Sequence, residues 1–145
     1  MADTTITSAN SIVTITIPSL FPAPVQLSGY SADRAWETAD LEITESQMGV
    51  DGRKTSGLVF NVVVQTFSLQ ADSPSKTIFN QLYRAMISAK DVFYIFGTIV
   101  LPSTGETFNG VRGTLKSFKP IPDAGKVLQP MNFVIEWESL QPSIL

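Results

Sequence analysis

Hydrophobic and polar residues alternate along most of this 145-residue chain, and a period of two predicts strands rather than helices. Residues 11–17 are β-branched at nearly every position and stop at Pro18, which predicts a first strand. Further strands are predicted over residues 92–101, 107–118 and 131–140. We therefore expect a mainly β fold. In the last predicted strand the apolar positions are Met131, Phe133, Ile135 and Trp137.

A hairpin of unusual length is predicted between residues 33 and 70. Both of its runs, residues 33–45 and 57–70, alternate between two faces, and the glycine-containing stretch 46–56 joins them. We expect the apolar face of the first run to lie in the core of a β-sandwich and its polar face to contact water. On this run the apolar positions are Ala39, Leu41 and Ile43, and the polar positions are Asp40, Glu42 and Thr44.

One helix is predicted after the hairpin, over about residues 74–89. Ser73 is a suitable N-cap, and Pro74 suits the first helical position because its missing N–H would be unpaired there anyway. Apolar residues then recur at helical spacing, and such a stripe usually packs on the sheet of its own chain. These elements predict a β-sandwich or barrel-forming subunit with one flanking α-helix. The stripe consists of Ile78, Phe79, Leu82 and Met86.

The length favours a single domain over residues 1–145. Residues 1–10 hold one isoleucine among threonine, serine and asparagine, too little apolar surface to offset the entropy of ordering. Residues 141–145 end in Ile144 and Leu145, which suit docking on a neighbour better than exposure to water. We therefore expect flexible arms at both ends, ordered only in an assembly.

Composition argues against several classes of function. Histidine and cysteine are absent, so the usual general base, the nucleophilic thiol and the nitrogen and sulfur ligands of zinc are missing. The net charge of −3 does not favour attraction to nucleic acid. No segment approaches the roughly 18 apolar residues of a membrane helix, and the first residues do not resemble a signal peptide. We expect a protein made in the cytoplasm, without enzymatic activity, cofactor, metal or membrane partner.

Acidic residues admit two chemical interpretations. Four carboxylates on predicted strands could serve glycoside hydrolysis or bind calcium, but we favour the interpretation that they form the solvated faces of those strands. The glycines of residues 48–54 fit no nucleotide-binding fingerprint, which favours a turn or a partner-contact loop. The four carboxylates are Asp40, Glu42, Glu136 and Glu138.

Two further patterns leave alternatives open. Five aromatic residues could form a sugar-binding platform like that of β-sandwich lectins, or could pack in the core and interfaces. Basic residues gather late in the chain whereas residues 33–51 carry six acids and one arginine. This asymmetry could match one subunit's edge to the next, although a solvated face is the default interpretation. The aromatic residues are Tyr30, Trp36, Tyr83, Tyr94 and Trp137, and the basic residues are Arg112, Lys116, Lys119 and Lys126.

A set of short motifs resembles the tail tube proteins of contractile-tailed bacteriophages. The motifs are Gly29-Tyr30, the glycine-containing stretch 49–52, a β run that ends in residues 67–71, and Ser73-Pro74-Ser75 before a short helix. The family commonly has asparagine where this chain has Lys76. The resemblance covers about residues 25–140.

The resemblance implies a virion structural protein. Subunits of that family form hexameric rings that stack helically into a tube inside a contractile sheath. The tube lumen is a closed β-barrel that houses the tape measure protein and then conducts genomic DNA without sequence-specific binding. Tubes of contractile secretion systems belong to the same class. The alternative of a different class is a carbohydrate-binding β-sandwich module.

This expectation assigns residues to two assembly roles. One set should line an acidic lumen that repels DNA phosphates, because its members alternate with apolar residues. The loop of residues 47–56 should make contacts between rings, since it is too long for a tight turn. The lumen residues are Asp40, Glu42, Thr44, Glu136 and Glu138, and the inter-ring residues are Met48, Gly49, Asp51, Gly52, Arg53 and Lys54.

Overall fold

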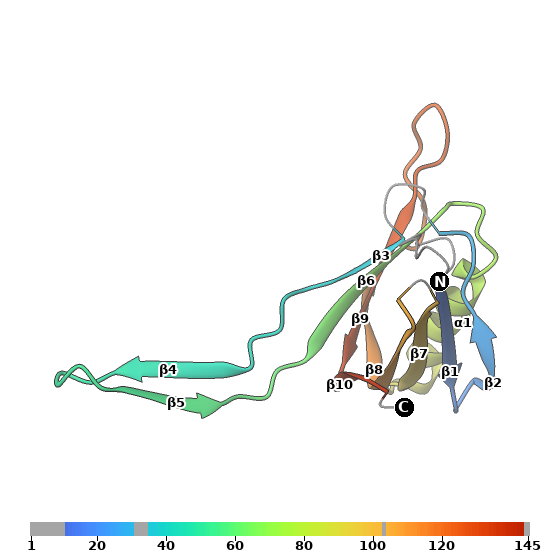
Figure 1. Cartoon of the computed structure of the whole chain (residues 1–145). Coiled ribbons are helices and arrows are strands. Elements are labelled where there is room, and N and C mark those ends of the chain that lie inside the picture. The colour runs from blue at the N-terminus through green and yellow to red at the C-terminus, as the bar shows by residue number, and fades with distance from the viewer. Residues whose placement is uncertain (1–10, 31–34, 103, 144–145) are drawn as a thin grey trace, which may run out of the picture.

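The computed structural model describes residues 11–30, 35–102 and 104–143 and is mainly β (Figure 1). In this described part, an eight-stranded sheet has the order β2-β1-β7-β8-β9-β6-β3 with β10 beside β8, and β4 and β5 form a separate two-stranded ribbon. One helix, α1, flanks the large sheet. The predicted fold class is therefore confirmed. The strands are β1 (Ile12–Ile17), β2 (Phe21–Gln26), β3 (Trp36–Thr38), β4 (Thr44–Met48), β5 (Lys54–Leu58), β6 (Val63–Leu69), β7 (Ile95–Leu101), β8 (Glu106–Phe118), β9 (Met131–Trp137) and β10 (Ser139–Pro142).

Strand β8 joins the two halves of the large sheet. Its first part pairs with β7 on one side and β10 on the other, whereas residues 114–118 pair with β9. Arg112 has a left-handed backbone (φ 47°), and the register shifts within the ladders of β8 with β7 and with β9. Such irregularities bend a strand. The half built from β1, β2 and β7 and the half built from β9, β6 and β3 share one buried cluster.

Trp137 lies at the centre of that cluster. A Cβ added to Gly97, Gly110 or Gly113 would lie only 2.5 to 2.8 Å from a ring atom of Trp137, so these positions admit no larger residue without movement. The indole Nε1 donates a hydrogen bond to Oε1 of Gln65 over 2.9 Å, and both side chains are buried. The alternation predicted for this strand is confirmed, because all four of its apolar side chains are at most 1% exposed.

Helix α1 (Lys76–Ala89) begins later than the sequence predicts. The hydroxyl of Ser73 donates to the carbonyl of Ser28 over 2.5 Å, and Oγ of Ser75 accepts the N–H of Ser28 over 2.8 Å. These bonds hold the Ser73-Pro74-Ser75 turn against the β2–β3 connection instead of starting the helix. The predicted packing of the stripe is confirmed, since Phe79 and Leu82 are fully buried and the Phe79 ring stacks on Phe133 at 4.6 Å.

The glycine of the first motif explains this turn. Gly29 has φ +73°, a left-handed conformation that glycine adopts without steric cost, and an added Cβ would lie 2.6 Å from Oγ of Ser73. Its carbonyl accepts the N–H of Gln70 over 2.8 Å. Two of the motifs that carry the family resemblance therefore meet in space, although about 44 residues separate them in the sequence.

The end of the described chain differs from the expectation of a flexible arm. Glu138 interrupts the predicted strand of residues 131–140, and its N–H donates to the carbonyl of Val111 over 3.0 Å. The chain then continues as β10, in which Gln141 and Pro142 pair with β8. The sheet thus supplies backbone partners to residues expected to be flexible. Residues 1–10 and 144–145 lie outside the described residues.

Candidate assembly surfaces

A long two-stranded projection leaves the body of the molecule between β3 and β6; we call residues 39–62 the arm (Figure 1). β4 and β5 pair in register from Thr44↔Leu58 to Met48↔Lys54. A short turn closes the ribbon, with the N–H of Gly49 donating to the carbonyl of Arg53 over 2.8 Å. The predicted hairpin of unusual length is confirmed. Half of the predicted long loop 47–56 is instead paired strand, because β4 continues to Met48 and β5 begins at Lys54.

The arm carries apolar side chains that its own subunit does not cover. Leu41 and Ile43 are 43% and 56% exposed, so their expected place in the sandwich core is wrong for the single subunit. The reason is topological: only β3 and β6 remain attached to the body, and the chain between them leaves it. A two-stranded ribbon alone is only marginally stable in water. The other exposed large apolar residues of the arm are Met48, Val50, Leu58, Phe60 and Val62.

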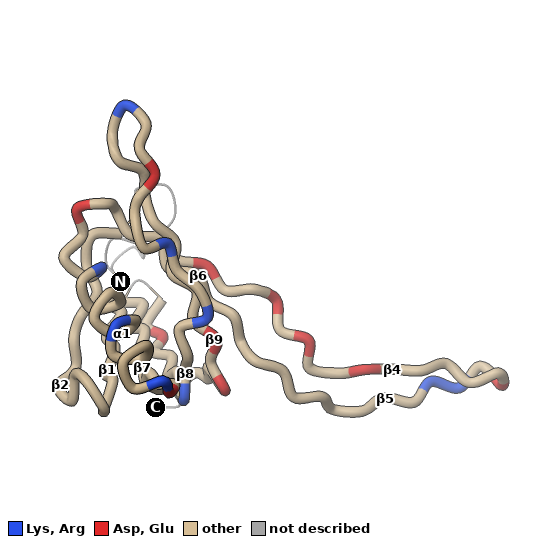
Figure 2. Tube along the Cα trace, turned by 180° about the vertical axis from the view of Figure 1, so that it is seen from behind, with Lys and Arg blue, Asp and Glu red and all other residues tan. Residues whose placement is uncertain are grey.

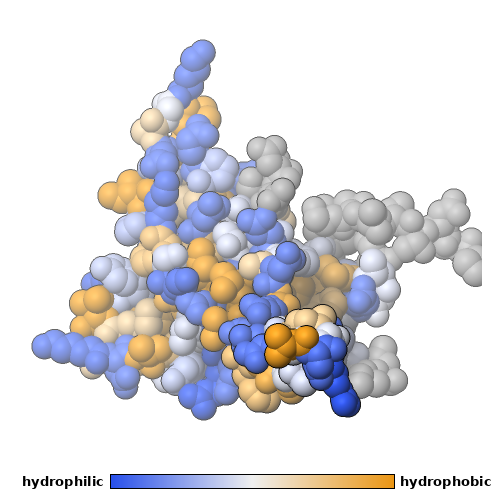
Figure 3. All heavy atoms as spheres, turned by 90° about the vertical axis from the view of Figure 1, so that its left-hand side faces the viewer, coloured by the Kyte–Doolittle hydropathy of each residue, from blue (hydrophilic) through white to orange (hydrophobic). Residues whose placement is uncertain are grey.

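Figure 3 views the molecule from the side on which the arm projects. Hydrophobic residues lie among hydrophilic ones over this surface instead of being hidden below it. A monomeric protein rarely leaves a large contiguous apolar surface in water. The exposure of the arm therefore indicates a surface that a partner covers.

A second surface is the side of β3, β6, β9 and residues 114–118 of β8 that points away from the core; we call it the polar face. On β6 the residues Val63, Gln65, Phe67 and Leu69 are buried, so the alternate residues point to this face. Directly paired residues lie on the same side of a sheet, and one such pair is bonded across strands, from the Ser68 hydroxyl to Oδ1 of Asn132 over 2.7 Å. The polar face comprises Glu37, Val64, Thr66, Ser68, Thr114, Ser117, Asn132, Val134 and Glu136.

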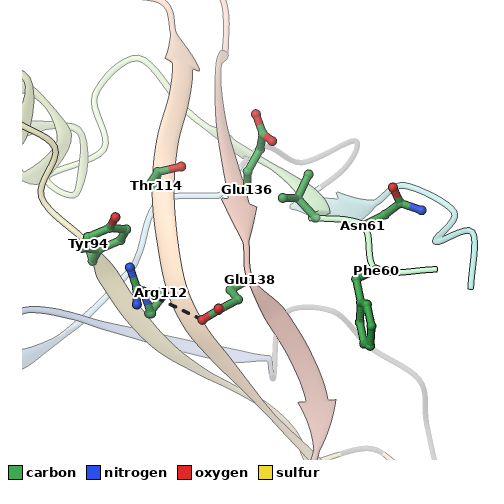
Figure 4. Close-up of a pocket in the computed structure, with 8 residues that line it drawn as sticks. Phe60, Asn61, Tyr94, Arg112, Thr114, Glu136 and Glu138 are labelled. Atoms are coloured by element: carbon green, nitrogen blue, oxygen red, sulfur yellow. Dashed lines mark ion pairs between the residues drawn. The ribbon is translucent and has the colours of Figure 1, made fainter. Parts of the chain in front are cut away.

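A depression of about 400 Å³ lies where the polar face meets the arm (Figure 4). Arg112 lies 4.5 Å from the centroid of the Tyr94 ring, and its Nε is 3.8 Å from Oε2 of Glu138. Its hydrogen bond with the Tyr94 side chain, and secondarily the charges of Tyr94 and Glu138, raise the pKa of Arg112. Phe60 of the arm lines the opposite side of the depression. Because the Arg112–Glu138 pair is exposed, it neutralises local charge and adds little stability.

The predicted lumen residues do not share one surface of the subunit. Glu136 points from the polar face, with Oε1 3.6 Å from Nζ of Lys116, and Glu138 pairs with Arg112. Asp40, Glu42 and Thr44 lie on the arm, where Figure 2 shows acidic residues along the strand that leads outward. Glu136 of β9 and Glu138 just after this strand thus have cations within reach. On the polar face itself, Glu136 has Lys116 nearby and Glu37 of β3 adds a second carboxylate.

Another projection was not predicted. The β8–β9 connection, residues 119–130, extends beyond the polar face at the end where β8 stops (Figure 1). It is held by an ion pair between Nζ of Lys119 and Oδ2 of Asp123 at 2.5 Å and by an Ala124↔Leu128 bridge. Ile121 and Val127 are over 70% exposed. The sequence did contain a signal for this projection. Prolines such as Pro120 and Pro130 normally mark a surface loop, and this loop carries apolar residues between them.

The alternative chemical sites are not assembled among the described residues. Trp137 is buried and Trp36 is half-buried, so the tryptophans form no exposed sugar-binding platform. No group of three histidine, cysteine or acidic residues in the described chain could hold a metal ion. No helix of that part is long and apolar enough to span a membrane. Burial raises the pKa of Tyr30 to about 12, a property of the core and not of a cleft.

Comparison with known proteins gives the class of the chain. A model of the tail fiber protein gp32 family matches residues 4–141, and the chain belongs to that family. No curated protein sequence matches it. The predicted resemblance to a contractile-tail protein is confirmed.

Solved structures show where the same fold occurs. The chain is similar to one in the PVC sheath/tube terminator of an extracellular contractile injection system, with a TM-score of 0.70, 12% identity and coverage of 99% of this chain and 100% of that chain. It is similar to a chain of the PVC sheath-tube complex, with a TM-score of 0.68, 12% identity and coverage of 97% and 93%. A chain of the anti-feeding prophage cap matches with a TM-score of 0.58, 13% identity and coverage of 100% and 95%. At these identities the likeness concerns the fold.

Proposed function

We propose that this protein is the wall subunit of a contractile-tail tube, in which hexameric rings stack helically. The observation that carries the proposal is the pair of unpaired edges on the polar half of the sheet. β3 pairs only with β6, and residues 114–118 of β8 pair only with β9, within the described chain. Unpaired edges recruit another strand, and a closed barrel removes them altogether.

Strand direction makes the two edges compatible. Each neighbouring pair in the order β8-β9-β6-β3 is antiparallel, so β3 runs opposite to β8. Rotation about a tube axis preserves strand direction. In a ring, β3 of one copy would therefore meet β8 of the next copy in antiparallel orientation, and the hydrogen-bond ladder would close without a mismatch.

The polar face would line the lumen of such a ring. Its opposite side carries the buried core, so α1 and the β1–β2–β7 half would lie outward, toward a sheath. Small polar residues dominate the polar face, whose carboxylates are Glu37 and Glu136, and Lys116 lies near Glu136. Beside this face Glu138 pairs with Arg112. This surface has no cationic excess to hold phosphates, which suits passage of a tape measure protein and then of DNA.

The arm would supply the rest of the lumen and the contacts between rings. Asp40, Glu42 and Thr44 would join the lumen where the arm continues along the wall of a neighbour. The tip, residues 47–56, exposes Met48 and Val50 together with charged residues and would contact the adjacent ring. Replacing residues 48–54 by a two-residue Asn-Gly turn should leave a folded subunit whose rings no longer stack. Long tubes formed by this variant would contradict the inter-ring role.

Electron microscopy of the purified chain tests the proposal, because a wall subunit should form rings or tubes of uniform diameter. Thr38→Pro sharpens the test. The backbone N–H of Ala39 donates to β6 and the carbonyl of Ala35 accepts from β6, so the N–H of Thr38, which lies between them, points to the free edge. Proline at position 38 removes this N–H without breaking the β3–β6 ladder. Thr38→Val, which keeps the N–H, is the matched control. We expect rings from the valine variant and monomers from the proline variant; monomeric wild-type protein would refute the proposal.

A further inference from the structure

An apolar cleft of about 390 Å³ opens beside the root of the arm, on the core side of β3. Its lining comes from both halves of the sheet and from β10, so it is the open side of the sandwich. Most of its surface is apolar. The principal lining residues are Trp36, Leu41, Ile99, Leu101, Phe108 and Leu140.

Two buried hydrogen-bond donors line this cleft without an acceptor. They are Nε1 of Trp36 and Nε2 of Gln65. The orientation of the Gln65 amide is settled by its neighbour: the indole N–H of Trp137 can only donate, so it binds Oε1 and leaves the NH₂ group on the other side. A buried donor without an acceptor has lost its hydrogen bond to water and gained none in return, which destabilises the protein. Two such donors at one apolar cleft indicate an absent partner that supplies carbonyl oxygens.

The opposite side of the subunit offers a surface of that kind. Helix α1 ends there with Tyr83, Ile87 and, just beyond it, Val92 at 43%, 61% and 51% exposure. The last carbonyl groups of a helix have no intrahelical partner, and the last turn of α1 contains no basic residue. A groove between this helix end and residues 114–118 of β8 leaves these apolar side chains accessible.

We propose that the cleft receives the C-terminal end of α1 from a second copy of the chain. The inference rests on the proposed function, since pairing β3 with the next copy's β8 brings these two sides together. Trp36 and Gln65 then donate to carbonyl oxygens of the neighbour's helix end. Trp36 and Thr38 pair with Phe67 and Gln65, so their side chains lie on the core side of the sheet. This is the side of the sheet on which the neighbour's helix would lie.

Charge agrees with this pairing. Lys90 and Lys116 line the groove at the helix end together with one acid, Asp91, and Lys116 also lies near Glu136. Leu41 lines the cleft, and its neighbours in the sequence are Asp40 and Glu42. Figure 2 shows basic residues beside α1 and β8 and acidic ones along the chain that leads outward to β4, with basic residues near the outer end of β5. In a ring, every acidic side would face the basic side of the next copy. Complementary charges of this kind favour correct register and suppress other pairings.

Cross-linking between differently tagged variants tests the contact, because the chain has no cysteine of its own. One variant carries Thr38→Cys in the cleft and the other Ile87→Cys on the helix; both are assembled together and treated with a short bis-maleimide. We expect a mixed covalent dimer. The control pairs Thr38→Cys with Ser19→Cys, an exposed turn residue at the far edge of the sheet, and should yield no dimer.

Point variants provide a second readout on the full chain. Trp36→Phe removes the indole donor and keeps the ring, so it should raise the protein concentration needed for ring formation about tenfold, as loss of one well-placed hydrogen bond at each contact requires. Ile87→Asp should abolish rings without loss of folding. Rings that form normally in both variants and give no Thr38–Ile87 cross-link would overturn this inference while leaving the tube proposal intact. Absence of rings from the wild-type chain would remove both.

Discussion

The body of the molecule and its arm carry the same alternating pattern with opposite outcomes. On β9 the apolar positions are at most 1% exposed, whereas Leu41 and Ile43 of the arm are 43% and 56% exposed. The body strands lie between other strands and a helix, and the arm strands pair only with each other. Alternation therefore predicts a strand with one apolar face but does not determine which molecule covers that face.

The body and the arm should also differ in what they contribute to stability and to association. The body buries its apolar residues within one subunit, so its stability should not depend on assembly. The arm, the cleft and the helix end carry most of what the subunit leaves uncovered. Substitutions in the body should thus change unfolding of the monomer, and substitutions in the arm should change association.

The largest effect is expected for Phe79→Ala in the body. Phe79 is fully buried and stacks on Phe133, so truncation should lower the free energy of unfolding by about 3–5 kcal/mol. Urea unfolding of the monomer measures the change. A loss below about 1 kcal/mol would show that α1 is not part of the subunit core.

The same substitution, glycine to alanine, can be made in the body and in the arm to compare their effects on unfolding. In Gly113→Ala the new Cβ would lie 2.5 Å from the Trp137 ring, and overpacking of this kind should cost about 1–3 kcal/mol. Gly57→Ala on the arm meets no atom within 4 Å and should leave unfolding unchanged or slightly improved. Equal losses in the two variants would contradict the comparison.

The pH dependence of stability should report on Tyr30 in the body. Burial raises the pKa of Tyr30 from 10.0 to about 12, so the folded state holds the proton more tightly than the unfolded chain. Stability is then fully present below pH 10 and decreases as pH rises toward 12. Tyr30→Phe should show a shallower decrease across this range in urea unfolding. An identical slope in variant and wild type would place the Tyr30 hydroxyl in water.

The smallest effect on the monomer is expected for Phe60→Ala in the arm. Phe60 is 91% exposed, so truncation should change the free energy of unfolding by less than about 0.5 kcal/mol. Assembly measured by sedimentation should weaken if a neighbour covers the ring. A loss of monomer stability comparable to that of Phe79→Ala would mean that the arm folds back on its own subunit.

Local patterns in the sequence predicted most of the elements of this fold. Alternation at Met131, Phe133, Ile135 and Trp137 and helical spacing at Phe79 and Leu82 specify elements and their inward faces, because these periodicities follow from backbone geometry alone. The short motifs at Gly29 and Ser73 also indicated the class of protein by resemblance, and the structure shows that they meet in one bonded turn.

Tertiary structure alone decided how those elements are distributed. Whether Leu41 is buried depends on where the sheet ends, and whether Glu136 is matched by Lys116 depends on a register shift in β8. The unpaired donors of Trp36 and Gln65 likewise arise from contacts between distant segments. Sequence periodicity carries no information about such contacts, because it reports the direction of a side chain and not what lies opposite it.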